Sequence, residues 1–239
     1  MDSVICNIPH SSLHIPEWAL KDFVISRKEL KAFSEKIVDL HVDELFDFVD
    51  DTNKISAELS RVVLDVERFR EDAKEEMSKL GMGLYYEKDD LGRIIRHRGK
   101  TYEDCLIYYD KYHDELTEKA GRILSENGSC YILDCHSFHE GLAYTGFPVE
   151  SYPDVCIGVN KTTLTEVKEL KVYNLFKDNG YSIKVNEPFS GALVPLAFGD
   201  NENIHSLMLE LNRRIYCGNA KDFERVKHLC REVYAILNE

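Results

Sequence analysis

Three short apolar segments of this chain each lead directly into a histidine or a carboxylate. They are residues 4–8, 130–133 and 206–209, which run into Pro9-His10-Ser11-Ser12, Asp134-Cys135-His136-Ser137 and Glu210-Leu211-Asn212-Arg213. Apolar runs of about four to eight residues are typical of buried β-strands, and open α/β sheets bind ligands and metals at the carboxyl ends of their strands. The three segments therefore predict one shared site at one edge of a sheet.

Strand-like runs and helical patterns alternate along the whole chain. Strands are predicted at residues 4–8, 61–66, 130–133, 155–159, 182–185 and 206–209. Helices are predicted at residues 29–49, with a break near Ser34, and at 101–126, 163–179 and 221–237. Two of the helices run into Asn-Gly pairs, which are typical of helix C-termini. This alternation predicts an α/β fold in which helices cover both faces of a largely parallel sheet.

The length and composition indicate one globular domain over residues 1–239. Hydrophobic residues make up 44% and charged residues 31% of the chain, the values of an ordinary soluble protein. No apolar stretch approaches the ~20 residues of a membrane span, and no basic signal-peptide head precedes the first run. With seven cysteines and no CxxC spacing, we expect reduced thiols and a cytoplasmic location. Nothing in the sequence indicates an oligomeric state.

The net charge argues against a nucleic-acid partner. A formal charge of −13 repels a phosphate backbone. Residues 93–100 form the one dense basic segment, and we expect a loop near an anionic substrate or a solvated hairpin there. They end a longer stretch, residues 71–99, that has weak periodicity and many charges. Long segments of this kind are often lids or binding loops, so we expect this one to pass over the site.

A zinc site is the chemistry that the two histidines suggest. Zinc held by three protein ligands with one open position lowers the pKa of water and stabilises an oxyanion. A single histidine at a strand end is more often a surface residue or loop hydrogen-bonder than a ligand, but His10 and His136 both follow apolar strands and precede a serine, which favours a site. On the helix predicted after the first strand, Asp39 and Asp43 share a face while His41 points elsewhere, so either carboxylate is a candidate third ligand. Asp134 lies two residues before His136 and is placed to orient its imidazole or to cap a turn.

Glu210 is the candidate general base. A carboxylate at the exit of an apolar strand beside a metal can take a proton from water and pass it to a leaving nitrogen. The alternative is a salt bridge from Glu210 to Arg213 or Arg214.

Two arginines and one loop are candidates for contacts with a substrate. Arg61 and Arg68 flank a predicted strand, and arginine binds carboxylates with two parallel hydrogen bonds. Seven residues apart, they point to opposite faces of a strand unless the chain bends, so at most one is expected to contact substrate. Residues 186–193 contain Ser190-Gly191 and form either a plain connection or a loop that brings backbone N–H groups to a substrate.

Seven motifs together resemble the N-formylglutamate amidohydrolase family. In order they are Ile8-Pro9-His10-Ser11-Ser12, Asp39-Leu40-His41-Val42-Asp43, residues 60–69 with Arg61 and Arg68, Tyr112-His113, Asp134-Cys135-His136-Ser137-Phe138, residues 186–191, and residues 209–216 with Glu210 and Arg213. The resemblance spans nearly the whole chain. It implies a phosphorylase/hydrolase-like three-layer α/β/α fold with a mostly parallel mixed sheet, related to zinc carboxypeptidases and aspartoacylases.

The resemblance also implies roles for individual residues. One Zn²⁺ per chain is expected on His10, Asp39 and His136, with Asp39 chosen over Asp43. Glu210 and Arg61 are the expected catalytic residues, and the expected substrate-binding residues are Arg68, Arg213, Ser190 and Gly191. The implied reaction is hydrolysis of the amide bond of a small N-acyl amino acid such as N-formylglutamate.

One position departs from the family pattern. Where the family usually has Asp-x-Asn-Arg, this chain has Asp65-Val66-Glu67-Arg68. If Glu67 faces the pocket, its charge disfavours a dianionic substrate. This departure points to an acyl amino acid other than formylglutamate as substrate. Independently of it, two other functions are compatible with the sequence: a carboxypeptidase-like metallopeptidase, and a non-catalytic binding protein on the same fold.

Overall fold

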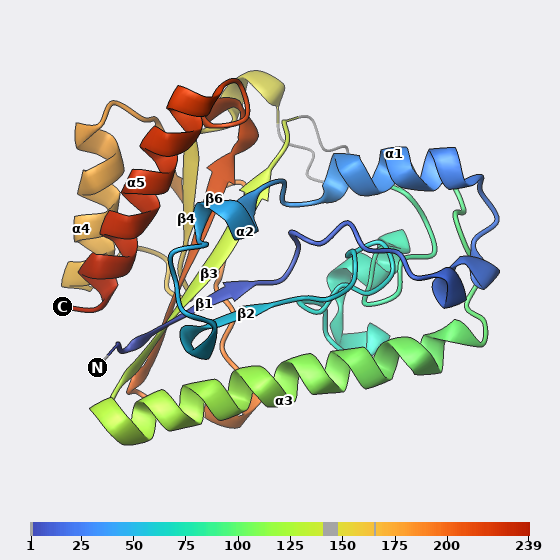
Figure 1. Cartoon of the computed structure of the whole chain (residues 1–239), viewed down its shortest axis with the longest axis horizontal. Helices are drawn as coiled ribbons and strands as arrows, with labels where there is room; N and C mark the ends of the chain where they lie inside the picture. Colours follow the sequence, from blue (N-terminus) through green and yellow to red (C-terminus); the bar gives the residue numbers. More distant parts are fainter. Residues whose placement is uncertain (1, 141–147, 165) are drawn as a thin grey trace.

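The computed structural model describes residues 2–140, 148–164 and 166–239, and in these ranges six strands form one sheet (Figure 1). The sheet order is β2-β1-β3-β6-β4-β5. The strands are β1 (Val4–Ile8), β2 (Lys54–Ser56), β3 (Cys130–Phe138), β4 (Val155–Gly158), β5 (Ile183–Val185) and β6 (Ile204–Asn212). All neighbouring pairs are parallel except β4 and β6, which are antiparallel. The predicted mostly parallel mixed sheet is confirmed.

Helices cover both faces of this sheet. The α-helices are α1 (Arg27–Ile37), α2 (Val42–Leu45), α3 (Thr101–Asn127), α4 (Val167–Asp178) and α5 (Ala220–Leu237). Short 3₁₀ helices are η1 (Glu17–Asp22), η2 (Asp51–Asn53), η3 (Asp72–Lys74), η4 (Glu76–Leu80), η6 (Val149–Ser151), η7 (Leu196–Phe198) and η8 (Arg213–Ile215). Figure 1 shows α4 and α5 on one side of the sheet and the long α3 on the other. None of the helices in the described ranges is both long and apolar enough to cross a membrane.

Alternation along the central strands divides the core into two layers. Ile5 and Ile132 pack into the cluster beneath α3. Cys6 and Leu133, one residue further along the same strands, pack into the cluster under α5. Successive strand residues point to opposite faces, and both faces of a sheet between helix layers are apolar. Asn7, Asp134, His136 and Glu210 are buried polar exceptions on these strands, and the last three line the cavity described below.

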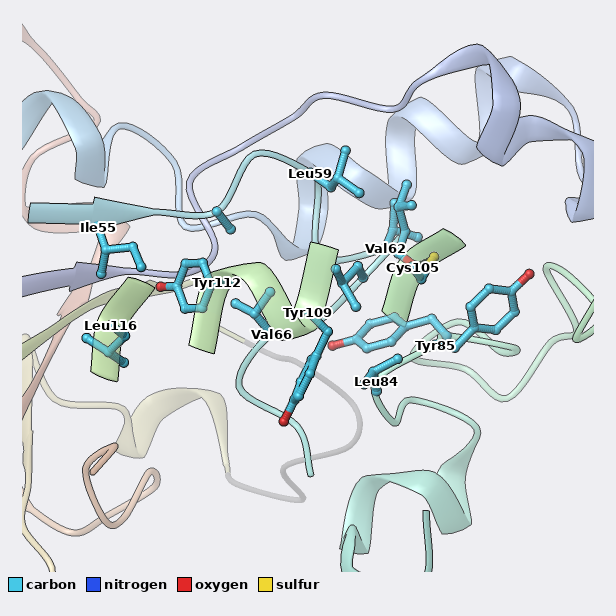
Figure 2. Packing of buried hydrophobic residues seen from close by; sticks show 14 of the residues in the cluster. Ile55, Leu59, Val62, Val66, Leu84, Tyr85, Cys105, Tyr109, Tyr112 and Leu116 are labelled. Atoms are coloured by element: carbon cyan, nitrogen blue, oxygen red, sulfur yellow. Dashed lines mark hydrogen bonds between the residues drawn. The ribbon is translucent and has the colours of Figure 1, made fainter. Parts of the chain in front are cut away.

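Residues 61–66 were predicted as a strand, and that prediction is wrong. The amide groups of Val63 and Leu64 both donate to the Ser60 carbonyl, at 2.8 and 3.1 Å, so the chain turns there. Its apolar side chains are buried against α3, as Figure 2 shows for Val62 and Val66. A buried apolar run does not by itself distinguish a strand from a packed turn. The edge strand beside β1 is instead the three-residue β2, which the sequence analysis missed.

The predicted helix 29–49 is two helices with a connection. α1 ends at Ile37 and α2 begins at Val42, so the break falls after Ser34 rather than at it. His41 in the connection has φ of 61°, a left-handed conformation that interrupts a helix. The other helices lie close to their predicted ranges. Thr165, within the predicted helix 163–179, is outside the described residues.

Residues 71–99 do not form the expected lid. Tyr85, Tyr86 and Ile95 are buried in the core that packs against α3. The basic end of the segment is held within the protein, because Arg93 pairs with Asp89 and Glu29, at 3.0 and 2.9 Å. Met77 is the one residue of this segment that lines the cavity described below.

Candidate active site

A cavity of about 580 Å³ is lined by the nine residues to which the family resemblance assigns metal-binding, catalytic or substrate-binding roles. Its walls come from the ends of β1, β3 and β6, the connection after α1, the turn at residues 61–69 and the loop before β6. The nine predicted site residues among its lining are His10, Asp39, Arg61, Arg68, His136, Ser190, Gly191, Glu210 and Arg213. The parallel pairing of β1 with β3 and of β3 with β6 brings their carboxyl ends to one edge. Their roles in catalysis and binding remain predictions.

Three buried side chains meet at the centre of this cavity. The Nδ1 atoms of His10 and His136 are 3.3 Å apart. Asp39 Oδ2 lies 2.9 Å from His136 Nδ1 and 3.7 Å from His10 Nδ1. All three residues are at most 4% exposed. Potential ligand atoms of the three lie within 4.8 Å of one another, so the cluster has the dimensions to hold a metal ion.

The structure distinguishes Asp39 from Asp43. The Asp39 amide donates to the His10 carbonyl at 2.9 Å, which ties the connection after α1 to the end of β1. Asp43 lies on α2 and is exposed. The expected shared helical face for the two carboxylates is wrong, because Asp39 lies outside both helices. Of the two, Asp39 alone belongs to the buried cluster.

Carboxylates hold the opposite nitrogen of each imidazole. His10 Nε2 lies 2.8 Å from Asp65 Oδ1, and His136 Nε2 lies 3.0 Å from Asp134 Oδ1. In the neutral imidazole, an Nε2–H donated to a carboxylate leaves Nδ1 as a lone pair that faces the cluster. Burial acts to lower the pKa of His136, but the nearby carboxylates of Glu67 and Asp134 outweigh it and raise that pKa well above 6.5. The cluster is therefore strongly attractive to positive charge.

Glu210 lies beside this cluster on β6. It is 8% exposed, and its Oε2 is buried with no hydrogen-bond partner among the described residues. Burial raises the pKa of Glu210 to about 8; the charge of Asp39 adds to the increase and His136 opposes it. The suggested salt bridge to Arg213 or Arg214 does not form in the structure: Arg214 pairs instead with Glu140 and Asp154. Buried carboxyl oxygens without partners are rare in native proteins, and this one lies in the cavity, where a ligand or water can form a hydrogen bond with it.

Arg61 and Arg68 both reach the cavity because the chain between them bends. Arg61 Nη2 lies 2.9 Å and Arg68 Nε 3.5 Å from the same oxygen of Asp65. The expectation that at most one arginine contacts substrate assumed a strand, and the turn removes that restriction. Arg68 Nε is buried and has no hydrogen-bond partner within the described ranges.

The loop before β6 forms another wall of the cavity. Ser190 is exposed at its rim. The amide groups of Ala192 and Leu193 donate to Asn160 Oδ1 and Asp134 Oδ2, at 2.9 and 3.1 Å. These two N–H groups are thus bonded within the protein, which for them favours the plain connection over the alternative of a loop that brings N–H groups to a substrate.

Two residues important to this geometry were not singled out from the sequence. Asp65 holds His10, Arg61 and Arg68 together. Asn7 is fully buried, and its side chain donates to Asp134 Oδ1 at 2.8 Å. The signal for Asn7 was present, because an amide inside the apolar run of residues 4–8 needs buried partners.

Comparison with known families agrees with this arrangement. The sequence model described as N-formylglutamate amidohydrolase matches residues 2–217. The chain belongs to the N-formylglutamate amidohydrolase family. The family match includes all nine residues that line the cavity and were predicted as site residues. No curated protein matches the chain significantly.

Two solved structures show the same fold as this member of the family. An N-formylglutamate amidohydrolase from Ralstonia eutropha JMP134 superposes with a TM-score of 0.78 at 23% identity, over 98% of this chain and 91% of that one. A gene product of Agrobacterium tumefaciens superposes with a TM-score of 0.71 at 13% identity, over 99% of this chain and 90% of that one.

Proposed function

We propose that this protein is a zinc-dependent hydrolase that cleaves the amide bond of a small N-acyl amino acid, with N-formylglutamate as the representative substrate. The observation that carries the proposal is the convergence of His10, Asp39 and His136 beside the unpartnered carboxylate of Glu210 in one cavity. Membership of the N-formylglutamate amidohydrolase family supports the same reaction class.

The donor set suits zinc. Two imidazole nitrogens and one carboxylate oxygen, with a further position open to solvent, are the ligands of many catalytic zinc sites. Their Nε2 atoms face carboxylates, which fixes each ring with Nδ1 toward the cluster. When bound, zinc supplies a Lewis acid that makes water a nucleophile at neutral pH. One ion per chain is expected.

Glu210 and Arg61 have separate roles in the proposed reaction. Glu210 takes the proton of the attacking water and passes it to the nitrogen of the leaving amine. Arg61, which is held between Asp65 and Asp39, faces the cavity and stabilises the negative charge that develops on the amide oxygen. This fixed orientation lets the arginine act without a change of conformation.

Two further arginines bind the acyl amino acid. The Arg68 guanidinium lines the cavity, where it can bind a substrate carboxylate, and its Nε makes an ion pair with Asp65 at 3.5 Å but no hydrogen bond. Arg213 also lines the cavity with a buried, unpartnered Nε among the described residues. Ser190 and Gly191 close the site from the loop before β6. A substrate with two carboxylates has one arginine for each.

A substrate screen with a metal assay tests the proposal. Zinc-loaded protein is offered N-formyl and N-acetyl amino acids and dipeptides, and bound zinc is measured in the wild type and in His136→Ala. Release of formate or acetate by the wild type, with loss of zinc and activity in His136→Ala, supports the proposal. Cleavage of dipeptides alone indicates a carboxypeptidase-like enzyme. Undiminished ligand affinity without zinc and without turnover indicates a binding protein.

A further inference from the structure

The two imidazoles differ in the number of carboxylates that face their Nε2 atoms. His10 Nε2 meets Asp65 at 2.8 Å. His136 Nε2 meets two carboxylates, Asp134 Oδ1 at 3.0 Å and Glu67 Oε2 at 3.1 Å. Glu67 Oε2 also lies 3.9 Å from His10 Nδ1. One oxygen of Glu67 is thus close to both histidines of the cluster.

Both oxygens of Glu67 are directed into the protein. Its side chain is 15% exposed although it lines the cavity. Asn7 Nδ2 donates to Glu67 Oε1 at 3.1 Å and to Asp134 Oδ1 at 2.8 Å. The Tyr112 hydroxyl donates to Asn7 Oδ1 at 2.5 Å, which fixes the orientation of that amide. The position of the Glu67 carboxylate is therefore set by buried partners before any substrate arrives.

The backbone around Glu67 is held as firmly as its side chain. The Glu67 amide donates to Asp65 Oδ1 at 3.2 Å. The preceding carbonyl, of Val66, accepts from His113 Nε2 on α3 at 2.7 Å, and the following one, of Arg68, accepts from the Tyr109 hydroxyl at 2.9 Å. Swinging Glu67 outward to meet a substrate would break the contacts to Asn7 and His136 without replacing them.

We propose that Glu67 is a positioning residue for His136: it supplies a second carboxylate that holds the Nε2 proton and strengthens the attraction of the cluster for a divalent cation. This inference rests on the proposed function, since it concerns the same cluster and its ion. It also revises the expected role of Glu67, because a carboxylate committed to His136 and Asn7 does not select among substrates by their charge.

A second cation on Glu67, Asp134 and His136 is the competing interpretation. Their potential ligand atoms also lie within 4.8 Å of one another. However, Asp134 already accepts from Asn7 and His136 on one oxygen and from the Leu193 amide on the other, at 3.1 Å. Hydrogen bonds from the protein thus already occupy both oxygens of Asp134, and we infer one ion per chain.

Zinc affinity of the full-length protein tests the role of Glu67. Wild type and Glu67→Gln are titrated with zinc alone against a chromophoric chelator, and hydrolysis of N-formylglutamate is compared with that of N-formylleucine. Removal of an outer partner of a metal-binding histidine typically weakens binding ~10- to 100-fold. We expect about 10-fold for Glu67→Gln, since Asp134 remains, with one zinc per chain and an unchanged ratio of the two hydrolysis rates.

Four other results would each contradict the proposed role of Glu67. An unchanged affinity means that Glu67 does not act through His136. Two zinc ions in the wild type and one in the variant make Glu67 a ligand. A raised preference for N-formylglutamate in the variant places Glu67 against the substrate. A wild type that binds no zinc refutes the proposed function itself and the inference with it.

Two more variants control for charge and folding. Glu58→Gln removes an exposed carboxylate that pairs with Lys111, and should leave zinc affinity unchanged. Glu67→Asp keeps the charge on a shorter side chain, and its affinity should lie between those of wild type and Glu67→Gln. An affinity no higher for Glu67→Asp than for Glu67→Gln would argue against a role for the charge.

Discussion

His136 and Glu210 are direct register partners on neighbouring parallel strands, β3 and β6. Side chains of register partners project to the same face of a sheet. The pairing of two central strands thus fixes the proposed base beside the cluster, and its position does not depend on a loop. The proton acceptor is consequently in place before substrate binds.

Glu210→Gln should abolish most turnover and leave zinc bound. Glutamine keeps the size of the side chain but cannot accept the proton. General acid–base catalysis typically raises the reaction rate by about 100- to 10,000-fold. The expected result is a fall of that size in kcat/KM, with zinc content near one per chain in both proteins. Metal analysis and steady-state kinetics check it. Undiminished activity would contradict the assignment of Glu210 as the base.

Asp39→Asn should lose zinc, whereas Asp43→Asn should not. Asp39 is buried in the cluster, and Asp43 is exposed on α2. Loss of a direct ligand should weaken zinc binding by more than the ~10- to 100-fold typical of losing an outer partner. Zinc titration of both variants measures the difference. Equal affinities would show that Asp39 is not a ligand.

This pair of aspartates also shows how far the sequence specifies the site. The convergence of His10, His136 and Glu210 was predicted because each follows an apolar run. The carboxyl ends of parallel strands lie at one edge of the sheet. A shared helical face that does not exist made Asp39 and Asp43 equal candidates, and only the family resemblance favoured Asp39. Its position depends on a hydrogen bond to the His10 carbonyl across the sequence, which no local pattern encodes.

The prediction of a strand at residues 61–66 was wrong for a related reason. Their apolar side chains are buried by α3, which lies about 40 residues later in the chain, as Figure 2 shows for Val62 and Cys105. Burial determined by a distant helix gives the same apolar run as burial within a sheet. The bend brings Arg61 and Arg68 to one oxygen of Asp65, so the arginines of the site could be named from the sequence but not placed.

Glu29→Gln should lower stability at neutral pH but not in strong acid. Hydrogen bonds from the Ser26 hydroxyl and amide, and then the ion pair with Arg93, lower the pKa of Glu29 from 4.5 to about 2. A lowered pKa stabilises the folded protein above the unfolded value of 4.5, and this contribution is lost as the pH falls toward 2. We expect a Tm about 1–2 °C below wild type at pH 7, and no difference near pH 2.

Thermal unfolding across this pH range checks the prediction for Glu29. Glu35→Gln on the same helix is the matched control, because Glu35 forms one exposed pair with Lys31 at 3.6 Å. Exposed pairs of this kind contribute little. A difference between wild type and Glu29→Gln that persists at pH 2 would mean that the charge of Glu29 is not its source.

Gly158→Ala should disturb the cavity from outside the cluster. A Cβ at this last residue of β4 would lie 2.3 Å from the Gly191 carbonyl oxygen and 2.3 Å from Met208 Cε. The methionine side chain can move, but the carbonyl moves only with the loop that carries Ser190 and Gly191. We expect a loss of about 1–3 kcal/mol in the free energy of unfolding, as for other overpacked sites, and a raised KM with unchanged zinc content.

Gly218→Ala is the control for Gly158→Ala, because a Cβ there meets nothing within 4 Å. Urea denaturation, zinc analysis and steady-state kinetics on the two variants separate a local effect on the loop from a general effect of replacing glycine. An unchanged KM in Gly158→Ala, together with the expected loss of stability, would show that the loop before β6 does not contact the substrate. A raised KM with retained zinc would support Ser190 and Gly191 as part of the substrate site, since the ion and its ligands lie on other elements.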